Sequence, residues 1–309
     1  MYDLIIIGGG PSGVAAGVYA ARKQIKTALI TESFGGQSYV SADIQNWIGT
    51  KSISGLDLAK TFEEHLRAQE GIEIIAGDKV EKIEDNGESF TLTTKNGQTL
   101  ESKYLLICTG SHRRRLNIPG EAEHEGRGVV YCSICDAPLF KNKEVAVIGG
   151  GNAGLEAVVD LLPYATKITL IIRSDTMKGD AITQEKIKAD PKVEIMYQVD
   201  TKEVLGEKFV SGIKYLDKKD NQEKELAVQG VFVEIGAVPN SDIVQGLVNI
   251  NERKEIVVDH KTEQTSHPRI WAVGDVSDVL YKQNNISAGD AVKAVLNIYD
   301  RIVKGEKKS

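Results

Sequence analysis

The chain has 309 residues, a net charge of −6, 41% hydrophobic residues and 27% charged residues. This length accommodates two domains of ordinary size, and the mildly acidic balance argues against a surface built for nucleic acid. No apolar run reaches the ~20 residues that a membrane span needs, and Met1 precedes a predicted strand with no basic segment or cleavage site, so we expect a cytoplasmic protein that binds neither nucleic acid nor a membrane.

The chain opens with the pattern of a dinucleotide-binding βαβ unit. Residues 3–7 are apolar and β-branched, as in a strand buried on both faces, and the turn that follows fits G-x-G-x-x-G. A helix is predicted over 14–23 and a second strand over 27–30. Glu32 then stands near the offset of the acid that binds a ribose hydroxyl, although it could also be a solvated turn residue. The candidate residues of the turn are Gly8, Gly10, Pro11, Ser12 and Gly13.

The next segment predicts a covering layer and a crossover. A helix over 56–69, a strand over 90–94 and an Asn-Gly turn after it are typical of a β-meander on a nucleotide domain. The buried strand 104–108 ends in Thr109-Gly110 and carries Cys108, which we interpret as a small buried hydrophobe. The charged run 112–115 predicts a solvated hinge loop, where we place a domain crossover.

A cysteine pair, Cys132 and Cys135, follows in a C-x-x-C spacing. In a reducing compartment such a pair is more often catalytic or metal-binding than structural. A zinc site would need two more ligands, but the remaining cysteine lies in an apolar strand and the five histidines show no metal-site spacing. The position of the Cys132/Cys135 pair between two glycine-rich turns indicates a redox-active dithiol that receives electrons from nucleotide cofactors.

From residue 144 the nucleotide-binding pattern repeats. A strand, a second G-x-G-x-x-G, a helix to about 162 and a strand over 168–172 follow in order. Strands are predicted over 194–197 and 230–235, then an exit loop over 236–240. A strand over 269–273 leads to Gly274-Asp275, and a final helix covers about 288–303. The candidate residues of the second turn are Gly149, Gly151, Asn152, Ala153 and Gly154.

With these motifs in this order, the chain resembles the low-molecular-weight thioredoxin reductase family of flavoprotein disulfide reductases along its whole length. Within this family, three segments resemble the alkyl hydroperoxide reductase flavoprotein branch, which serves peroxiredoxins: Phe34-Gly-Gly-Gln37, 132–140 and Tyr281-Lys-Gln283. The resemblance implies an α/β fold with two Rossmann-like domains, each a three-layer ββα arrangement, in a homodimer. The NAD(P)H domain, 115–240, would interrupt an FAD domain formed by 1–114 and 241–309, and rotate about its crossovers.

The resemblance also implies roles for individual residues. Cys132 would exchange with the partner, Cys135 would accept electrons from the flavin, and Asp136 would be the acid–base group, with a turn-forming aspartate as its plain alternative. The residues implied around FAD are Gly8, Gly10, Gly13, Glu32, Gly36, Gln37, Asn46, Thr109, Gly110, Gly274, Asp275, Lys282 and Gln283.

The electron donor depends on the segment after the second strand of the repeat, Ile172 to Lys178. NADPH-using relatives carry H-R-R-x-x-x-R there, and NADH-using relatives carry glutamate where this chain has Ile172. Arg173 and Lys178 favour NADPH over NADH, because arginine and lysine receive a 2′-phosphate. Since the segment departs from both patterns, ferredoxin or another donor stays open.

The sequence therefore predicts a thioredoxin reductase-like enzyme that passes electrons from NAD(P)H through FAD and the Cys132/Cys135 disulfide. Its partner would be thioredoxin, a thioredoxin/glutaredoxin-like carrier or a peroxiredoxin system. One rival is a ferredoxin:NADP oxidoreductase-like electron-transfer protein, but such proteins lack the C-x-x-C. The other is a non-catalytic module that binds FAD and senses redox state.

Overall fold

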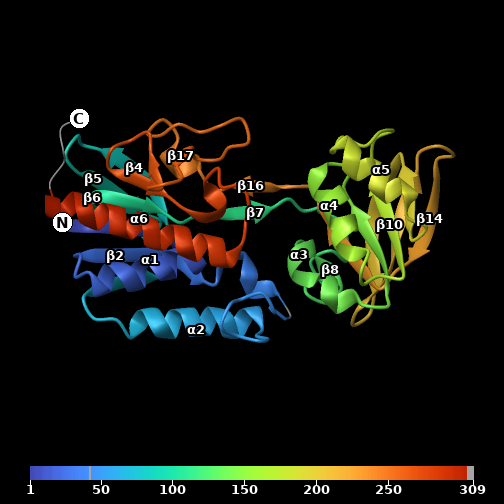
Figure 1. The fold of residues 1–309 in the computed structure, drawn as a ribbon, viewed down its shortest axis with the longest axis horizontal. Coiled ribbons are helices and arrows are strands. Elements are labelled where there is room, and N and C mark those ends of the chain that lie inside the picture. The colour runs from blue at the N-terminus through green and yellow to red at the C-terminus, as the bar shows by residue number, and fades with distance from the viewer. Residues whose placement is uncertain (42, 305–309) are drawn as a thin grey trace. The chain divides into compact units, whose positions relative to one another are not determined.

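The computed structural model describes residues 1–41 and 43–304. By its internal contacts the chain divides into two units: the first contains Met1–Tyr39, Trp47–His112 and the chain from Val238 onward, and the second contains Val40–Asn46 and Arg113–Ala237. Each unit is a mixed α/β body with its own main sheet (Figure 1). The predicted fold class, one Rossmann-like domain inserted into another, is confirmed.

The first unit is built on a sheet in the order β17-β18-β19-β6-β1-β2-β3. Its central strand β1 pairs in parallel with β2 on one side and β6 on the other. The strands of this unit are β1 Tyr2–Gly9, β2 Thr27–Phe34, β3 Ile72–Ala76, β4 Val80–Asp85, β5 Phe90–Thr94, β6 Thr99–Ile107, β17 Val258–Asp259, β18 Gln264–Thr265 and β19 Ile270–Ala272.

Two layers cover this sheet. Helices α1 (Pro11–Arg22) and α6 (Asn284–Lys304) lie side by side, with α2 (Gly55–Arg67) against α1 (Figure 1). The antiparallel strands β4 and β5 supply Val80, Phe90 and Leu92 to a core that also contains Ile5 and Leu105 of the sheet. Among the described residues, no helix combines the length and apolar character of a membrane span.

The second unit repeats this plan. Its parallel sheet has the order β11-β10-β9-β15-β8, and a separate antiparallel sheet has the order β12-β13-β14. The strands are β8 Val129–Val130, β9 Glu144–Ile148, β10 Lys167–Ile172, β11 Val193–Tyr197, β12 Val199–Gly206, β13 Val210–Asp217, β14 Gln222–Ala227 and β15 Gly230–Val233. The helices are α3 Ser133–Asp136, α4 Asn152–Leu161 and α5 Ala181–Ala189.

Two apolar clusters hold the layers of the second unit together. One joins the parallel sheet to α4 and α5 through Leu155 and Ile187, and the other joins it to β12 and β13 through Val204 and Ile213. Burial of such side chains contributes about 1.5–3 kcal/mol each. The unit is therefore a three-layer ββα arrangement.

The structure differs from the sequence prediction in three places. The antiparallel sheet β12–β14 and helix α5 were not predicted, because their charged outer faces resemble loop sequence. The predicted solvated loop over 112–115 is wrong for its first half: residues 112 and 113 belong to β7 (Ser111–Arg113), which pairs with β16 (Ala237–Pro239). Arg114 and Arg115 are exposed and outside any strand, and Arg115 forms an ion pair with Glu125 at 2.7 Å. Helix α6 begins at Asn284, four residues earlier than expected.

Candidate functional site

Cys132 and Cys135 form a disulfide at the start of the short helix α3. Cys132 is the residue before the helix, and its Sγ accepts a hydrogen bond from the backbone N–H of Cys135 at 3.3 Å. Both cysteines are only half-buried, and Ile134 between them has 59% of its surface exposed. An N–H donor stabilises a thiolate, so this geometry suits Cys132 as the attacking sulfur after reduction.

Two buried carboxyl groups accompany the disulfide, and burial raises the pKa of both. The pKa of Asp136 rises to about 6, although Ser41, which donates to Asp136 Oδ1 at 3.4 Å, and Arg113 oppose the rise. The pKa of Glu234 rises to about 7 through burial, opposed by Arg113 and by the Ser133 backbone N–H. Acid–base groups with pKa values near the working pH transfer protons efficiently, which fits the role expected for Asp136.

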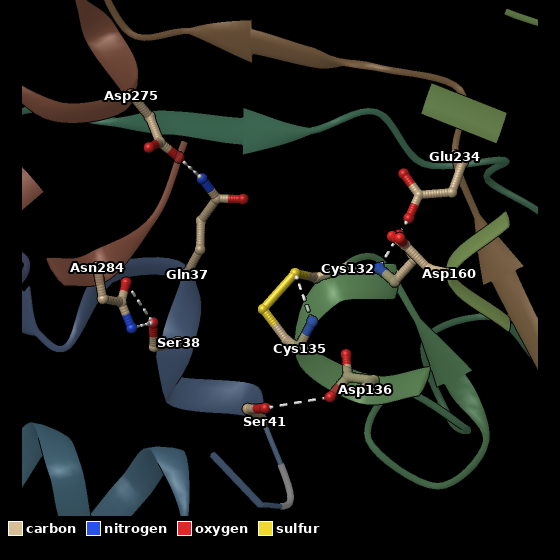
Figure 2. The surroundings of a disulfide bond; sticks show 11 residues. Gln37, Ser38, Ser41, Cys132, Cys135, Asp136, Asp160, Glu234, Asp275 and Asn284 are labelled. Carbon is tan, nitrogen blue, oxygen red and sulfur yellow. Dashed lines mark hydrogen bonds between the residues drawn. A yellow bond between two sulfur atoms is a disulfide. The ribbon is translucent and has the colours of Figure 1, made fainter. Parts of the chain in front are cut away.

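Glu234 belongs to a hydrogen-bonded group that sequence reasoning missed. Its Oε1 accepts from the backbone N–H of Ser133 at 3.2 Å, and the hydroxyl of Ser133 donates to Asp160 Oδ2 at 2.7 Å. Glu234 and Asp160 thus both bind Ser133, the first of the two residues between the cysteines. Figure 2 shows both carboxyl groups beside the disulfide helix. Since Ser133 and Glu234 are 101 positions apart, no local motif could have revealed this support of the dithiol helix.

Replacing Glu234 by glutamine is expected to change how stability depends on pH. Burial raises the pKa of Glu234 from 4.5 to about 7, so the stability present below its unfolded pKa is lost as pH rises through about 7. Glutamine keeps an oxygen acceptor for Ser133 but cannot ionise. The unfolding free energy of the parent protein should therefore fall as the pH rises from about 5 to about 8.5. In Glu234→Gln this fall should be smaller by about 1–3 kcal/mol.

Urea unfolding at both pH values measures this difference, and the exposed Glu207→Gln in the same unit is the matched control. The control removes the same charge from the surface and should follow the parent curve. Equal losses in Glu234→Gln and the parent would show that Glu234 is already ionised in the folded protein at about pH 5.

The first glycine turn has room for a dinucleotide. A Cβ at Gly8, where φ is +120°, would lie 2.3 Å from the Cys108 carbonyl oxygen, and one at Gly13 would lie 1.9 Å from the Gly8 oxygen. A Cβ at Gly10 would meet nothing closer than Gly36 at 3.9 Å. The chain's own packing therefore explains two glycines, and the open space at Gly10 fits a pyrophosphate against the unpaired N–H groups that begin α1.

Polar side chains gather beside this turn at the carboxyl ends of β2, β6 and β19. The Gln37 amide donates to Ser111 Oγ at 2.9 Å and to Asp275 Oδ2 at 3.1 Å. Figure 2 shows the Gln37–Asp275 bond, and Asp275 follows Gly274 just after β19. The Thr109 hydroxyl donates to the Asn240 carbonyl oxygen at 2.7 Å, and the Asn240 backbone N–H donates to the Gly110 carbonyl oxygen at 2.9 Å. Open α/β sheets bind ligands at this edge, so these residues could hold FAD.

The second glycine turn has the same design. Gly149, with φ +141°, could not carry a Cβ because the Glu234 carbonyl oxygen would lie 2.2 Å away, and at Gly154 the Gly149 oxygen would lie 1.9 Å away. A Cβ at Gly151 would meet no heavy atom within 4 Å. Gly151 begins α4 without a side-chain cap, so its turn also offers free backbone N–H donors to a pyrophosphate.

A cavity of about 700 Å³ opens from this second turn, entirely within the second unit. Arg173 and Lys178 line it as predicted, and Ile172, where an acid would favour NADH, is buried in its wall. Sequence reasoning missed Arg114, Arg115, Asp200 and Lys218, which also line the cavity. Its size and its positive charge suit a nicotinamide nucleotide.

The structure also positions the remaining predicted site residues. Glu32 is exposed within β2, which extends beyond the predicted strand end to Phe34. Asn46 lies on segment Val40–Asn46, which groups with the second unit by its contacts. Lys282 pairs with Glu255 at 3.1 Å, and Gln283 accepts from Ser287 N at the start of α6.

The remaining candidates lie in or beside the glycine turns. Pro11 is the first residue of α1, where a missing N–H costs nothing, and Ser12 is buried. The side chain of Asn152 accepts from the backbone N–H of Asp180 at 2.8 Å, while Ala153 is exposed. Gly36 begins the 3₁₀ turn Gly36–Val40 that leads to Gln37.

Known proteins match the chain over nearly its whole length. The "NADH dehydrogenase" of Bacillus subtilis is 39% identical over 303 residues, and an alkyl hydroperoxide reductase component of Pseudomonas putida is 40% identical over 306 residues. Each match covers 98% of this chain. The chain spans only 59% and 58% of the lengths of these two relatives.

Solved structures match the fold as well. A thioredoxin reductase from Streptococcus pyogenes aligns with a TM-score of 0.92 at 33% identity, and one from Giardia duodenalis with 0.91 at 29%; each alignment covers 98% of this chain and 99% of the other. The sequence profile of the pyridine nucleotide-disulphide oxidoreductases matches residues 2–294. The chain therefore belongs to the pyridine nucleotide-disulphide oxidoreductase family and has the fold and the C-x-x-C disulfide of its thioredoxin reductase-like flavoproteins.

Proposed function

We propose that this protein passes electrons from NAD(P)H, through FAD in the first unit and the Cys132/Cys135 disulfide in the second, to thioredoxin or a related thiol carrier. The observation that carries the proposal is one disulfide on a chain with two glycine turns, each open only at its middle glycine. The alkyl hydroperoxide reductase relatives support a peroxiredoxin system as the final acceptor. A homodimer is proposed on the family resemblance alone.

The dithiol chemistry follows from the geometry of α3. FAD, when bound, would supply two electrons that derive from the hydride of the nicotinamide nucleotide, and reduction of the disulfide to two thiols would take up two protons. Asp136, buried beside Cys135 with its pKa raised to about 6, holds and releases one of these protons. The Cys132 thiolate attacks the carrier disulfide, one carrier thiol leaves, and Cys135 displaces the second by re-forming the Cys132–Cys135 bond.

The donor site is the cavity of the second unit. Gly149 to Gly151 would hold the pyrophosphate, and Arg173 and Lys178 would receive a 2′-phosphate on the adenosine ribose. These two cations support NADPH as the preferred donor, with NADH as the alternative. Reduction by ferredoxin would leave this cationic cavity without a function.

An anaerobic titration of the flavin-loaded protein with NADPH, and separately with NADH, tests the proposal. Rapid loss of flavin absorbance with either nucleotide, followed by donor-dependent reduction of a disulfide such as dithionitrobenzoate, is the expected result. If neither nucleotide bleaches the flavin while dithionite does, the donor is not a nicotinamide nucleotide. If the flavin is bleached but no disulfide is reduced, the protein is an electron-transfer or sensing module instead.

A further inference from the structure

The nucleotide cavity contains one acid among its cations. The described residues that line it include Arg114, Arg115, Arg173, Lys178 and Lys218, and a single carboxylate, Asp200 of β12. Asp200 is therefore the exception in a wall that otherwise attracts anions.

Asp200 is held by three of the cations around it. Its Oδ1 lies 3.1 Å from Arg173 Nε, and its Oδ2 lies 3.1 Å from Lys218 Nζ and 3.9 Å from Lys202 Nζ. The Arg173 side chain is 84% exposed, whereas that of Asp200 is 22% exposed. The Asp200 carboxylate is thus mostly buried in the cavity wall, whereas the Arg173 guanidinium that it pairs with is exposed to solvent.

This ion cluster lies where a Rossmann fold distinguishes the two nicotinamide nucleotides. Arg173 follows β10 directly, and the residue after the second strand of the unit faces the adenosine 2′ position. A carboxylate there accepts a hydrogen bond from the 2′-hydroxyl of NADH, and it repels a 2′-phosphate. Ile172, the last residue of β10, cannot supply this carboxylate. Asp200 of β12 supplies one instead, beside Arg173.

We propose that Asp200 is a specificity-determining residue: by occupying Arg173 and Lys218 it weakens their hold on a 2′-phosphate and lets the cavity accept NADH alongside NADPH. This inference rests on the proposed function of the cavity. The ion pairs that Asp200 forms are partly exposed and contribute little to stability, so removing its charge should leave the fold intact.

Binding of NADP⁺ and NAD⁺, measured by titration calorimetry on the flavin-loaded protein at constant ionic strength, tests the proposal without turnover. In Asp200→Asn, the affinity for NADP⁺ relative to NAD⁺ should rise on the order of tenfold, because an arginine and a lysine are released for the phosphate. Lys218→Gln should move the ratio in the opposite direction.

Glu203→Gln is the matched control. Glu203 lies on the same strand, forms an ion pair of similar exposure with Lys214 at 2.9 Å, and is not among the residues that line the cavity. Its nucleotide ratio should stay within twofold of the parent. An unchanged ratio in Asp200→Asn, or an equal rise in Glu203→Gln, would overturn the role of Asp200 while leaving a nucleotide site in place. If the parent protein binds neither nucleotide, the proposed donor fails, and this inference fails with it.

Discussion

Cys132→Ser is expected to abolish reduction of any disulfide substrate while the flavin is still reduced by its nucleotide donor. Cys132 lies half-buried at the start of α3, and its Sγ accepts from the Cys135 N–H at 3.3 Å. A serine hydroxyl at this position can accept the same hydrogen bond, but it cannot attack a disulfide or form one with Cys135. Stopped-flow absorbance measures the flavin step, and dithionitrobenzoate reduction measures the thiol step.

Cys135→Ser should behave differently from Cys132→Ser. It leaves the Cys132 thiol, which can still form a mixed disulfide with a carrier, but no second thiol resolves it. A covalent complex with thioredoxin should therefore accumulate in Cys135→Ser and be absent from Cys132→Ser, as measured by intact mass.

The third cysteine provides the control for both variants. Cys108 is buried after β6, and burial raises the pKa of its thiol to about 12, so it is not a nucleophile near neutral pH. Cys108→Ala should retain both steps. Loss of flavin reduction together with disulfide reduction in Cys132→Ser would contradict the assignment, since the donor site does not require that sulfur.

The features that the sequence could predict are those that depend on neighbours along the chain. The spacing of each glycine turn can be recognised in the sequence because its first glycine excludes a Cβ at its last one, as the Gly8 oxygen does at Gly13 and the Gly149 oxygen at Gly154. The buried parallel strands are readable because both of their faces are apolar, as in β1 and β10. These local constraints were sufficient to predict two nucleotide-binding units and a dithiol between them.

The features that the sequence could not predict depend on distant segments. Asp200 meets Arg173 only because the antiparallel sheet β12–β14 packs on the parallel sheet through residues such as Val204 and Ile213. That sheet itself escaped prediction because its outer face is charged and exposed, as in β14, and resembles loop sequence. The same limit applies to Glu234, whose contact with α3 joins residues far apart in the chain.

Gly151→Ala is expected to block reduction by NAD(P)H without disturbing the fold or the flavin. A Cβ at Gly151 would meet no heavy atom of the protein within 4 Å, and Gly151 has an extended backbone that alanine adopts without strain. The added methyl would instead occupy the space where a pyrophosphate approaches the start of α4. Because small misplacements of a reacting group are costly, flavin reduction by the nucleotide should slow on the order of 10²-fold.

Gly10→Ala is the matched variant in the other turn. Its Cβ would also enter open space, with the nearest atom 3.9 Å away, so this protein should fold but lose FAD rather than the donor. Gly151→Ala should keep its full FAD content and its reduction by dithionite, which needs no nucleotide site. The two alanines together separate the cofactor sites, since each variant removes one site and leaves the other. Normal reduction of Gly151→Ala by both nucleotides would mean that the pyrophosphate does not contact this turn, and that the open space at Gly151 has another use.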